Sequence, residues 1–394
     1  MSLLLSEITR IRNILTLRYD PEEASALPHK TWMDWNPTES DPEGIETESR
    51  LRVIIIENLS HYDQIGIALS SGVDSSLLLA LIRQEFPKKK ILALHYTGAN
   101  NDELEASRKL ANKFNAGFYE IHPVPVFDRI PFMIEMLDAP KWDAYDYVIS
   151  RIARLEECDV LVTGDGADEL YAGYTFRYEQ FERFTGGRDH WHVLDEEISA
   201  YLGCHKNDFV EDHEQLFPNN EDFTNFNFLR DIHPYFYESF QNPLTWFNKM
   251  ILADYNGKLL HNFLIKKNAF QKTIGIPIFG PMLEPAIRDF APHISLREKY
   301  YHGTGKIPLR AICKRLGLNP PFKKLGFTHD IKSEFQKYYS DYLSPIKKQD
   351  ALIYKYGIIN PEWLKKHEGE QLEERQINKI VSLYTLEKYL QWKQ

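Results

Sequence analysis

The sequence predicts an α/β fold, a doubly wound parallel sheet with helices on both faces, followed by a mainly helical C-terminal region. Between residues 45 and 180, short apolar runs alternate with longer segments of helical periodicity, which is typical of a parallel sheet covered by helices. After about residue 180, aromatic side chains become dense and strand-like runs become rare. This change indicates helices that pack on the first region.

The apolar runs are expected to be strands because each is short, largely aliphatic and bounded by polar or glycine-containing turns. The expected strands are residues 65–69, 91–96, 116–121 and 159–163. Apolar residues at helical spacing follow or precede them. The expected helices are residues 46–59, 75–86, 102–114, 128–137 and 144–155, with a further helix beginning near Asp168.

Four parts are expected along the chain. Residues 1–44, punctuated by prolines, form an N-terminal arm anchored by Trp32 and Trp35. Residues 45–180 form the α/β core, residues 181–345 form a mainly helical region that contributes to the active site, and residues 346–394 form a charged helical cap at the C-terminus.

Composition narrows the class of protein. The net charge of −10 and the pI of about 5.8 argue against a nucleic-acid partner, since an acidic surface repels a phosphate backbone. The three cysteines, Cys158, Cys204 and Cys313, form neither a disulfide framework nor a metal-ligand spacing. No apolar run reaches the roughly 20 residues of a membrane span. A cytoplasmic protein without a membrane partner is therefore expected.

The turn after the first expected strand has the features of an anion site. It reads Leu69-Ser70-Ser71-Gly72-Val73-Asp74-Ser75-Ser76. The first N–H groups of a helix have no intrahelical partner and the helix dipole adds positive charge, so phosphate is favoured there. Asp74 suits Mg²⁺, which bridges to phosphates. The alternative is an ordinary turn in which Asp74 or Ser71 caps the helix.

A second acidic turn follows the fourth expected strand. It reads Gly164-Asp165-Gly166-Ala167-Asp168-Glu169-Leu170-Tyr171-Ala172-Gly173-Tyr174. Two acidic residues at a helix start are ordinary. A third carboxylate beside two glycines, at the carboxyl edge of a parallel sheet, indicates a ligand site. The alternative is a solvated turn with acidic caps.

Both turns resemble segments of asparagine synthetases. The first is similar to the SGGxDS loop of the ATP pyrophosphatase superfamily, with Ser71 where the family usually has Gly. The second is similar to the SGEGADELFGGY segment over twelve consecutive positions, residues 163–174. The resemblance covers roughly residues 13–335 and implies the adenine nucleotide α-hydrolase-like fold of that superfamily.

The resemblance implies ATP and Mg²⁺ as cofactors. Asp74 and Asp168 would hold the metal, and the ATP or pyrophosphate contacts would come from Leu69, Ser70, Ser71, Gly72, Asp74, Ser75, Ser76, Thr97, Gly98, Gly164 and Lys323. Two residues would be catalytic. Lys306, in a segment similar to TKxxLR, would stabilise charge at the α-phosphate, and Asp165 takes the place of the family's Glu next to the reacting carboxylate. A solvated surface lysine is the alternative for Lys306.

Several acceptor-side positions depart from the family. Ala139 replaces the Glu of the LDEP turn, and Thr273, Gly275 and Gly280 stand for the Glu, Arg and Asp of ExRxPFLD. The loss of these charged side chains weakens the case for aspartate as the substrate. The chain starts Met1-Ser2 without the family's N-terminal cysteine, so no glutaminase domain is expected.

The leading hypothesis is an AMP-forming amide ligase. It would adenylate a small-molecule or peptide carboxylate, release pyrophosphate, and pass the acyl group to ammonia or an amine. The nitrogen would come from free ammonia, a separate amidotransferase or the substrate's own amine. The alternatives are a ring-forming cyclase of the β-lactam or lasso-peptide type, a tRNA-modifying ATP pyrophosphatase, and a non-catalytic nucleotide-binding relative.

Overall fold

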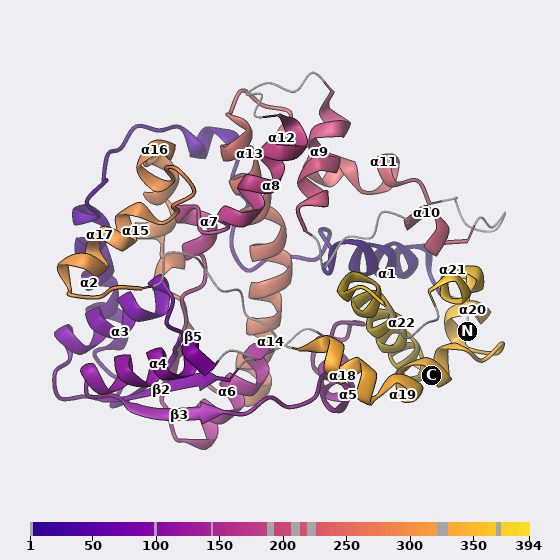
Figure 1. Ribbon diagram of the computed structural model, residues 1–394, viewed down its shortest axis with the longest axis horizontal. Coiled ribbons are helices and arrows are strands. Elements are labelled where there is room, and N and C mark those ends of the chain that lie inside the picture. The colour runs from indigo at the N-terminus through magenta and orange to yellow at the C-terminus, as the bar shows by residue number, and fades with distance from the viewer. Residues whose placement is uncertain are drawn as a thin grey trace.

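The computed structural model describes residues 3–97, 101–142, 145–186, 193–205, 213–218, 226–320, 330–367 and 372–394. At its centre lies a parallel sheet of five strands in the order β3-β2-β1-β4-β5 (Figure 1). The strands are β1 (Gln64–Ala68), β2 (Lys90–Tyr96), β3 (Gly117–Ile121), β4 (Val160–Val162) and β5 (Ile278–Phe279). The predicted fold class, a parallel sheet covered by helices, is confirmed.

Helices make up most of the remaining structure. The first half of the chain contains α1 (Leu5–Leu17), α2 (Ile45–Leu59), α3 (Val73–Glu85), α4 (Asn101–Lys113), α5 (Val126–Leu137), α6 (Tyr145–Leu155), α7 (Ala167–Tyr171), α8 (Thr175–Thr185) and α9 (Leu194–Gly203). The second half contains α10 (His213–Leu216), α11 (Phe228–Asp231), α12 (Tyr237–Phe240), α13 (Trp246–Asp254), α14 (Leu264–Ile274), α15 (Pro285–Arg288), α16 (Leu296–Lys299), α17 (Ile307–Arg315), α18 (Ile331–Lys337), α19 (Tyr339–Ile346), α20 (Leu352–Lys355), α21 (Pro361–Lys366) and α22 (Glu374–Trp392). Shorter segments are η1 (Trp32–Trp35), η2 (His233–Phe236), η3 (Tyr255–Phe263, a π-helix), η4 (Pro281–Leu283) and η5 (Ala291–His293).

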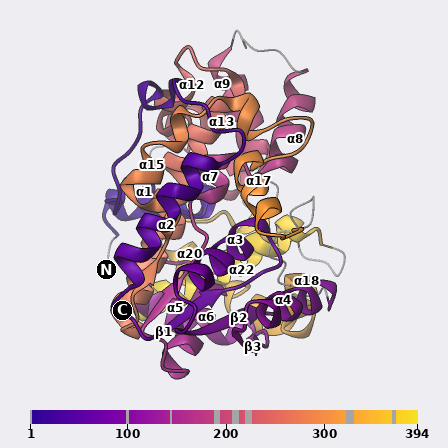
Figure 2. The same cartoon turned by 90° about the vertical axis from the view of Figure 1, so that its left-hand side faces the viewer.

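Strand side chains alternate between two hydrophobic clusters, one on each face of the sheet. On β2, Ile91 and Ala93 belong to the cluster that includes α3, whereas Leu94 and Tyr96 belong to the cluster that includes α6. Helices α3 and α4 contact the strands on the first face, and α6 contacts them on the second. Figures 1 and 2 show α2 and α3 packed side by side on the first face. Because both faces are covered, the strands read as nearly continuous apolar runs.

The order of the strands creates a switch point between β1 and β4. The chain builds outward through β1, α3, β2, α4 and β3, and then returns through α5 and α6 to the other side of β1. There β4 pairs with β1, with Ile65, Gly66 and Ile67 facing Val160, Leu161 and Val162. In open parallel sheets ligands bind at such a point, at the carboxyl ends of the strands.

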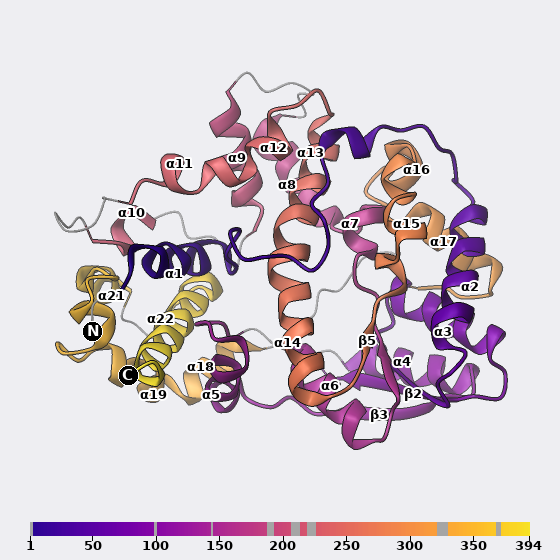
Figure 3. The same ribbon diagram turned by 180° about the vertical axis from the view of Figure 1, so that it is seen from behind.

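Strand β5 and helix α1 were not predicted from the sequence. Strand β5 comes from the region expected to be mainly helical and pairs with β4. It was missed because two residues are too few to show a period. Helix α1 lies in the N-terminal arm, for which no helix was predicted. It packs against α22, next to which it is drawn in Figures 1 and 3.

Helix α14 connects the upper helices to the sheet. Figure 3 shows it running down the middle of the molecule to end beside α6 and β5, and its contacts with α6 and α5 agree. It places its buried face on the second face of the sheet. In the described residues, no helix is both long enough and apolar enough to cross a lipid bilayer.

Candidate active site

The two acidic turns predicted from the sequence meet at the switch point. Because β1 and β4 are neighbours in the sheet, the turns that follow them emerge side by side. A Cβ built on Gly164 would lie 2.9 Å from the Cβ of Asp74, closer than real Cβ atoms approach. The absence of a side chain at Gly164 therefore allows the two turns to touch.

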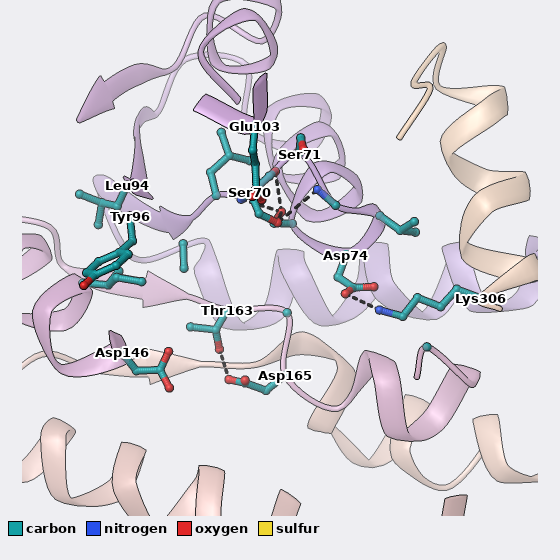
Figure 4. A pocket seen from close by; sticks show the side chains of 18 of the residues that line it. Ser70, Ser71, Asp74, Leu94, Tyr96, Glu103, Asp146, Thr163, Asp165 and Lys306 are labelled. Atoms are coloured by element: carbon teal, nitrogen blue, oxygen red, sulfur yellow. Dashed lines mark hydrogen bonds and ion pairs between the residues drawn. The ribbon is translucent and has the colours of Figure 1, made fainter. Parts of the chain in front are cut away.

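A cavity of about 280 Å³ opens between these turns. The predicted residues that line it are Leu69, Ser70, Ser71, Gly72, Asp74, Ser75, Gly164, Asp165 and Lys306 (Figure 4). Ser76, Thr97 and Asp168 are not part of that lining. Thr97 donates its backbone N–H to the Ile121 carbonyl and its hydroxyl to Glu120. Gly98 and Lys323 lie outside the described residues, and the structure does not test them.

Lys306 joins the two turns electrostatically. Its ammonium Nζ lies 2.6 Å from Asp74 Oδ2 and 2.6 Å from Asp168 Oδ1. The Lys306 side chain is 6% exposed, and those of Asp74 and Asp168 are 18% and 13% exposed. Burial lowers the pKa of Lys306, but the two carboxylates outweigh burial and hold the pKa above its ordinary value. The lysine is therefore a fixed cation at the junction of the turns.

The backbone around Lys306 is held in an unusual conformation. Lys306 is the N-cap of α17 with φ 59° and ψ 35°, the left-handed region that non-glycine residues seldom adopt. Its N–H donates to the Tyr171 carbonyl at 2.9 Å. A Cβ on Gly173 would collide with Asp168 and Lys306, and one on Gly305 would collide with Ala172. The close contacts that Gly173 and Gly305 allow thus hold Lys306 in this conformation. A strained backbone of this kind is typical of functional sites.

The serine-rich turn is ordered by its own side chains. Ser75 Oγ accepts from the Ser70 N–H at 3.0 Å and donates to the Ser70 carbonyl at 2.9 Å. Gly72 has φ −69°, and Ser71 is not among the residues with positive φ. The serine in place of the family's glycine therefore causes no backbone strain at position 71.

Glu103 of α4 lies against the same turn. It accepts a hydrogen bond from the Ser71 N–H, and Figure 4 shows it beside Ser70 and Ser71. Burial raises the pKa of Glu103, while His95 and the Ser71 N–H oppose the shift. The carboxylate thus occupies one backbone donor of the turn that was predicted to receive phosphate.

Further charged side chains, Asp165, Asp146 and Lys267, line the other side of the cavity. Asp165 Oδ2 accepts from the Thr163 hydroxyl at 2.5 Å and forms an ion pair with Lys267 of α14. Asp146 of α6 lines the same wall, and Figure 4 shows its carboxylate and that of Asp165 pointing toward one another. Burial lowers the pKa of Lys267, and Asp146 opposes this shift.

The donor set at Asp74 and Asp168 fits a magnesium ion. Oxygens from both carboxylates contact one Nζ atom, so they reach a common cation. Mg²⁺ is usually held by one or two carboxylates with water and phosphate oxygens completing its shell. Within the described residues, no group of three or more His, Cys, Asp or Glu side chains forms a self-sufficient metal site. Any metal here would therefore need ligands from a bound phosphate.

Sequence reasoning missed several lining residues. Glu103 lies in residues 102–106, which resemble the family's DExxA helix, and Arg310 lies in the segment similar to TKxxLR. The resemblance could therefore have indicated both. Asp146 and Lys267 carry no such signal, because α6 and α14 are distant in sequence and are brought to this wall only by packing.

Gly275, where the family has Arg, ends α14 in the left-handed conformation with φ 74°, a position that favours glycine.

Comparison with known proteins identifies the family. A family model described as asparagine synthase matches residues 48–391. Glutamine-hydrolyzing asparagine synthetase 1 of Bacillus subtilis (strain 168) is 23% identical over 332 residues, which cover 75% of this chain and 51% of that protein. The chain thus spans about half the length of this curated relative.

Among solved structures, the chain is similar to the NH3-dependent NAD synthetase from Campylobacter jejuni subsp. jejuni NCTC 11168, solved in complex with the nitrate ion. That comparison has a TM-score of 0.24 and 20% identity, covering 33% of this chain and 59% of the other. The family model, in contrast, runs from α2 through most of α22. The chain belongs to the asparagine synthase family.

Proposed function

We propose that this protein is an ATP-dependent, AMP-forming amide ligase. It adenylates a substrate carboxylate, releases pyrophosphate, and transfers the acyl group to ammonia or an amine. The observation that carries the proposal is the convergence of Asp74 and Asp168, from two separate turns, on Lys306 at the switch point. Family membership supports the same reaction class.

The serine-rich turn suits the pyrophosphate portion of ATP. It stands at the N-terminus of α3, where the helix dipole and the first N–H groups favour an anion. Asp74 and Asp168 would hold Mg²⁺, which supplies charge neutralisation of the phosphates when bound. ATP would displace Glu103 from the Ser71 N–H. The leaving group of the first step would then lie along this turn.

Lys306 has the charge and position required near the reacting phosphate. Pairing with Asp74 and Asp168 keeps it protonated, and burial excludes water that would weaken its field. Once its carboxylate partners bind another cation, Nζ is free to donate to a phosphate or acyl oxygen. Adenylation then replaces a hydroxide leaving group by AMP, which makes attack by an amine feasible.

Pyrophosphate release tests the proposal. Purified protein is supplied with Mg²⁺, ATP and a panel of carboxylates, with and without ammonium chloride. Pyrophosphate and AMP formed in equal amounts, dependent on one carboxylate, support the proposal. ATP binding without any turnover supports a non-catalytic relative, and a requirement for tRNA supports a tRNA-modifying enzyme. Turnover that yields ADP would contradict cleavage between the α- and β-phosphates.

A further inference from the structure

Helix α7, which carries Asp168, is too short to fix its own orientation. It has five residues, Ala167–Tyr171, whereas isolated helices shorter than about 12 residues are marginal in water. Gly166 before it and Ala172 after it have φ of 83° and 61°, in the left-handed region, so the helical backbone stops at both ends. The orientation of Asp168 therefore depends on the contacts that α7 makes with the helices around it.

Glu169, the residue after Asp168, is held by a buried hydrogen bond. It is 2% exposed, and its Oε1 accepts from the Tyr174 hydroxyl at 2.6 Å. A hydroxyl that donates to a carboxylate at this distance makes a stronger bond than a neutral pair does. Because Asp168 and Glu169 are neighbours on one short helix, a rotation of α7 that displaced Asp168 would break this bond.

Arg177 of α8 supports Tyr174 in turn. Its guanidinium carbon Cζ lies 3.6 Å from the centre of the Tyr174 ring, a cation–π contact. Its Nη1 donates to Asp254 Oδ1 at 2.7 Å, and the two side chains are 5% and 1% exposed. The Tyr201 hydroxyl donates to the same oxygen at 2.9 Å. Separating charges buried this deeply is strongly unfavourable, so Arg177 is a fixed support.

The anchor of this chain of contacts belongs to a helical path that also holds the start of the second acidic turn. Asp254 ends α13, and the path continues through η3 into α14, where Lys267 pairs with Asp165. Helix α7 contacts both α13 and η3, and Figures 1 and 3 draw it beside α8 and α13. The turn is thus supported near each of its two candidate functional carboxylates.

From these contacts we propose that Glu169, Tyr174 and Arg177 are positioning residues, which hold Asp168 in the orientation that binds Mg²⁺. The proposal rests on the proposed function and concerns side chains behind the site, since none of the three lines the cavity. Residues that orient a metal ligand from outside its coordination shell matter for binding, and the loss of one typically lowers metal affinity by about 10–100-fold.

The test measures how much Mg²⁺ strengthens the binding of ATP. Equilibrium dialysis gives the Kd for ATP in EDTA and in saturating Mg²⁺, and the first value divided by the second reports on the metal site without requiring turnover. Tyr174→Phe removes only the hydroxyl. It should lower this ratio about tenfold, with the Kd in EDTA near the wild-type value. The Mg²⁺ concentration that gives half-maximal pyrophosphate release should rise by a similar factor.

Tyr178→Phe is the matched control. Tyr178 lies one turn further along α8 and is fully buried, and its hydroxyl has no hydrogen-bond partner among the described residues. This variant should leave the ratio unchanged, because the hydroxyl that it loses supports nothing.

Two substitutions of Glu169 test the same hydrogen bond from its other end. Glu169→Gln keeps an oxygen for the Tyr174 hydroxyl and should retain most of the ratio, whereas Glu169→Leu should lose about as much as Tyr174→Phe. Combining Glu169→Leu with Tyr174→Phe should lose no more than either alone, because both remove one contact. If Tyr174→Phe does not fold, as judged by its Tm, the comparison of Glu169→Gln with Glu169→Leu decides.

The outcomes distinguish this proposal from the ligase proposal. An unchanged ratio in Tyr174→Phe, or an equal loss of ATP affinity in Mg²⁺ and in EDTA, overturns the positioning role and leaves the ligase proposal standing. Wild-type ATP binding that does not respond to Mg²⁺ also overturns the positioning role. If the ratio falls as expected but no carboxylate supports pyrophosphate release by the wild type, the positioning role stands and the ligase proposal fails.

Discussion

Among single residues, Lys306 occupies the position at which the sequence predicted a metal ion. Asp74 and Asp168 were predicted to share Mg²⁺, and in the structure they share the Lys306 ammonium. Two partly buried carboxylates that contact the same atom need a counter-charge, and a buried ammonium needs anions. Each group therefore offsets the desolvation of the others. The three residues were found from the sequence, but their mutual contact was not.

Replacing Lys306 should separate metal binding from turnover. Lys306→Met removes the cation, so pyrophosphate release should fall by about 10²–10³-fold. The same variant should bind Mn²⁺ more tightly without ATP, because the metal no longer competes with the lysine for Asp74 and Asp168. Electron paramagnetic resonance of free Mn²⁺ measures the second effect.

Lys314→Met is the control for that experiment, since Lys314 is exposed on the same helix, α17. It should change neither quantity. Weaker Mn²⁺ binding by Lys306→Met than by wild type would contradict competition between lysine and metal. Unchanged pyrophosphate release would remove Lys306 from the chemistry.

At the scale of the element, the site depends on how closely two strand-to-helix turns approach. The turn after β4 touches the turn after β1 at Gly164 and Asp74. Helix α17 then places Lys306 between them through the hydrogen bond to the Tyr171 carbonyl. No single element forms the site, so the register of β1 against β4 determines how closely the two turns approach.

Adding one methyl group at this contact should disturb the chemistry more than the fold. Gly164→Ala forces a Cβ against Asp74 and should lower pyrophosphate release at least tenfold, with a loss of about 1–3 kcal/mol in stability from overpacking. Urea denaturation and the release assay measure the two effects. Gly203→Ala is the control, because a Cβ there meets only Phe184 at 3.5 Å. Wild-type activity in Gly164→Ala would show that the turns separate without consequence.

A second element-scale feature is the histidine pair that fastens the N-terminal arm to η3. His29 Nε2 and His261 Nε2 lie 2.9 Å apart. Burial, with the nearby His29 adding to it, lowers the pKa of His261 to about 4. Burial also lowers the pKa of His29. The hydrogen bond between the two rings requires one Nε2 atom to accept it from the other. It is therefore lost when both rings are fully protonated.

This pair should make stability depend on pH in a defined window. In the unfolded chain His261 binds a proton more readily than in the folded protein. The stabilisation from neutral His261 is therefore complete above pH 6.5 and is lost as the pH falls toward 4. At pH 5 the loss should be about 1–2 kcal/mol. His261→Gln should flatten the profile of Tm against pH in this window, whereas His122→Gln, at a side chain 79% exposed, should not. An unchanged slope in His261→Gln would contradict the assignment.

For the molecule as a whole, the C-terminal helix α22 is a largely buried element. Helix α22 contacts α1, α5, α18, α19 and α20, and most of its residues are buried. The Trp142 indole N–H donates to Ser382 at 2.9 Å, and Lys379 donates to the Leu15 carbonyl. The two ends of the chain are thus packed into one body with the segment that precedes α6.

A cavity created in the core around α22 should lower stability without changing the candidate active site. Leu383 is fully buried, and Leu383→Ala should lower the free energy of unfolding by about 2–5 kcal/mol. Urea denaturation measures this, and the KM for ATP should stay at the wild-type value. Gln391→Ala, at an exposed position of the same helix, should change stability little. A large change in the KM for ATP in Leu383→Ala would indicate that α22 shapes the site.

Local sequence patterns were enough to predict the strands and helices between residues 45 and 180 and the two acidic turns. Those features depend on local periodicity, on glycine and on residue type, all of which operate over a few neighbouring residues. The expected strand at residues 65–69 and the observed β1 at Gln64–Ala68 differ by one residue at each end.

Which side chains meet depends on how the elements pack in three dimensions. Strand β5, the Lys306 contact with Asp74 and Asp168, and the wall formed by Asp146, Asp165 and Lys267 join residues far apart in the chain. Burial creates these contacts, because a charged side chain is tolerated inside a protein where packing brings an opposite charge to it. That pairing follows from the arrangement of the sheet and its helices, and no short segment of sequence contains it.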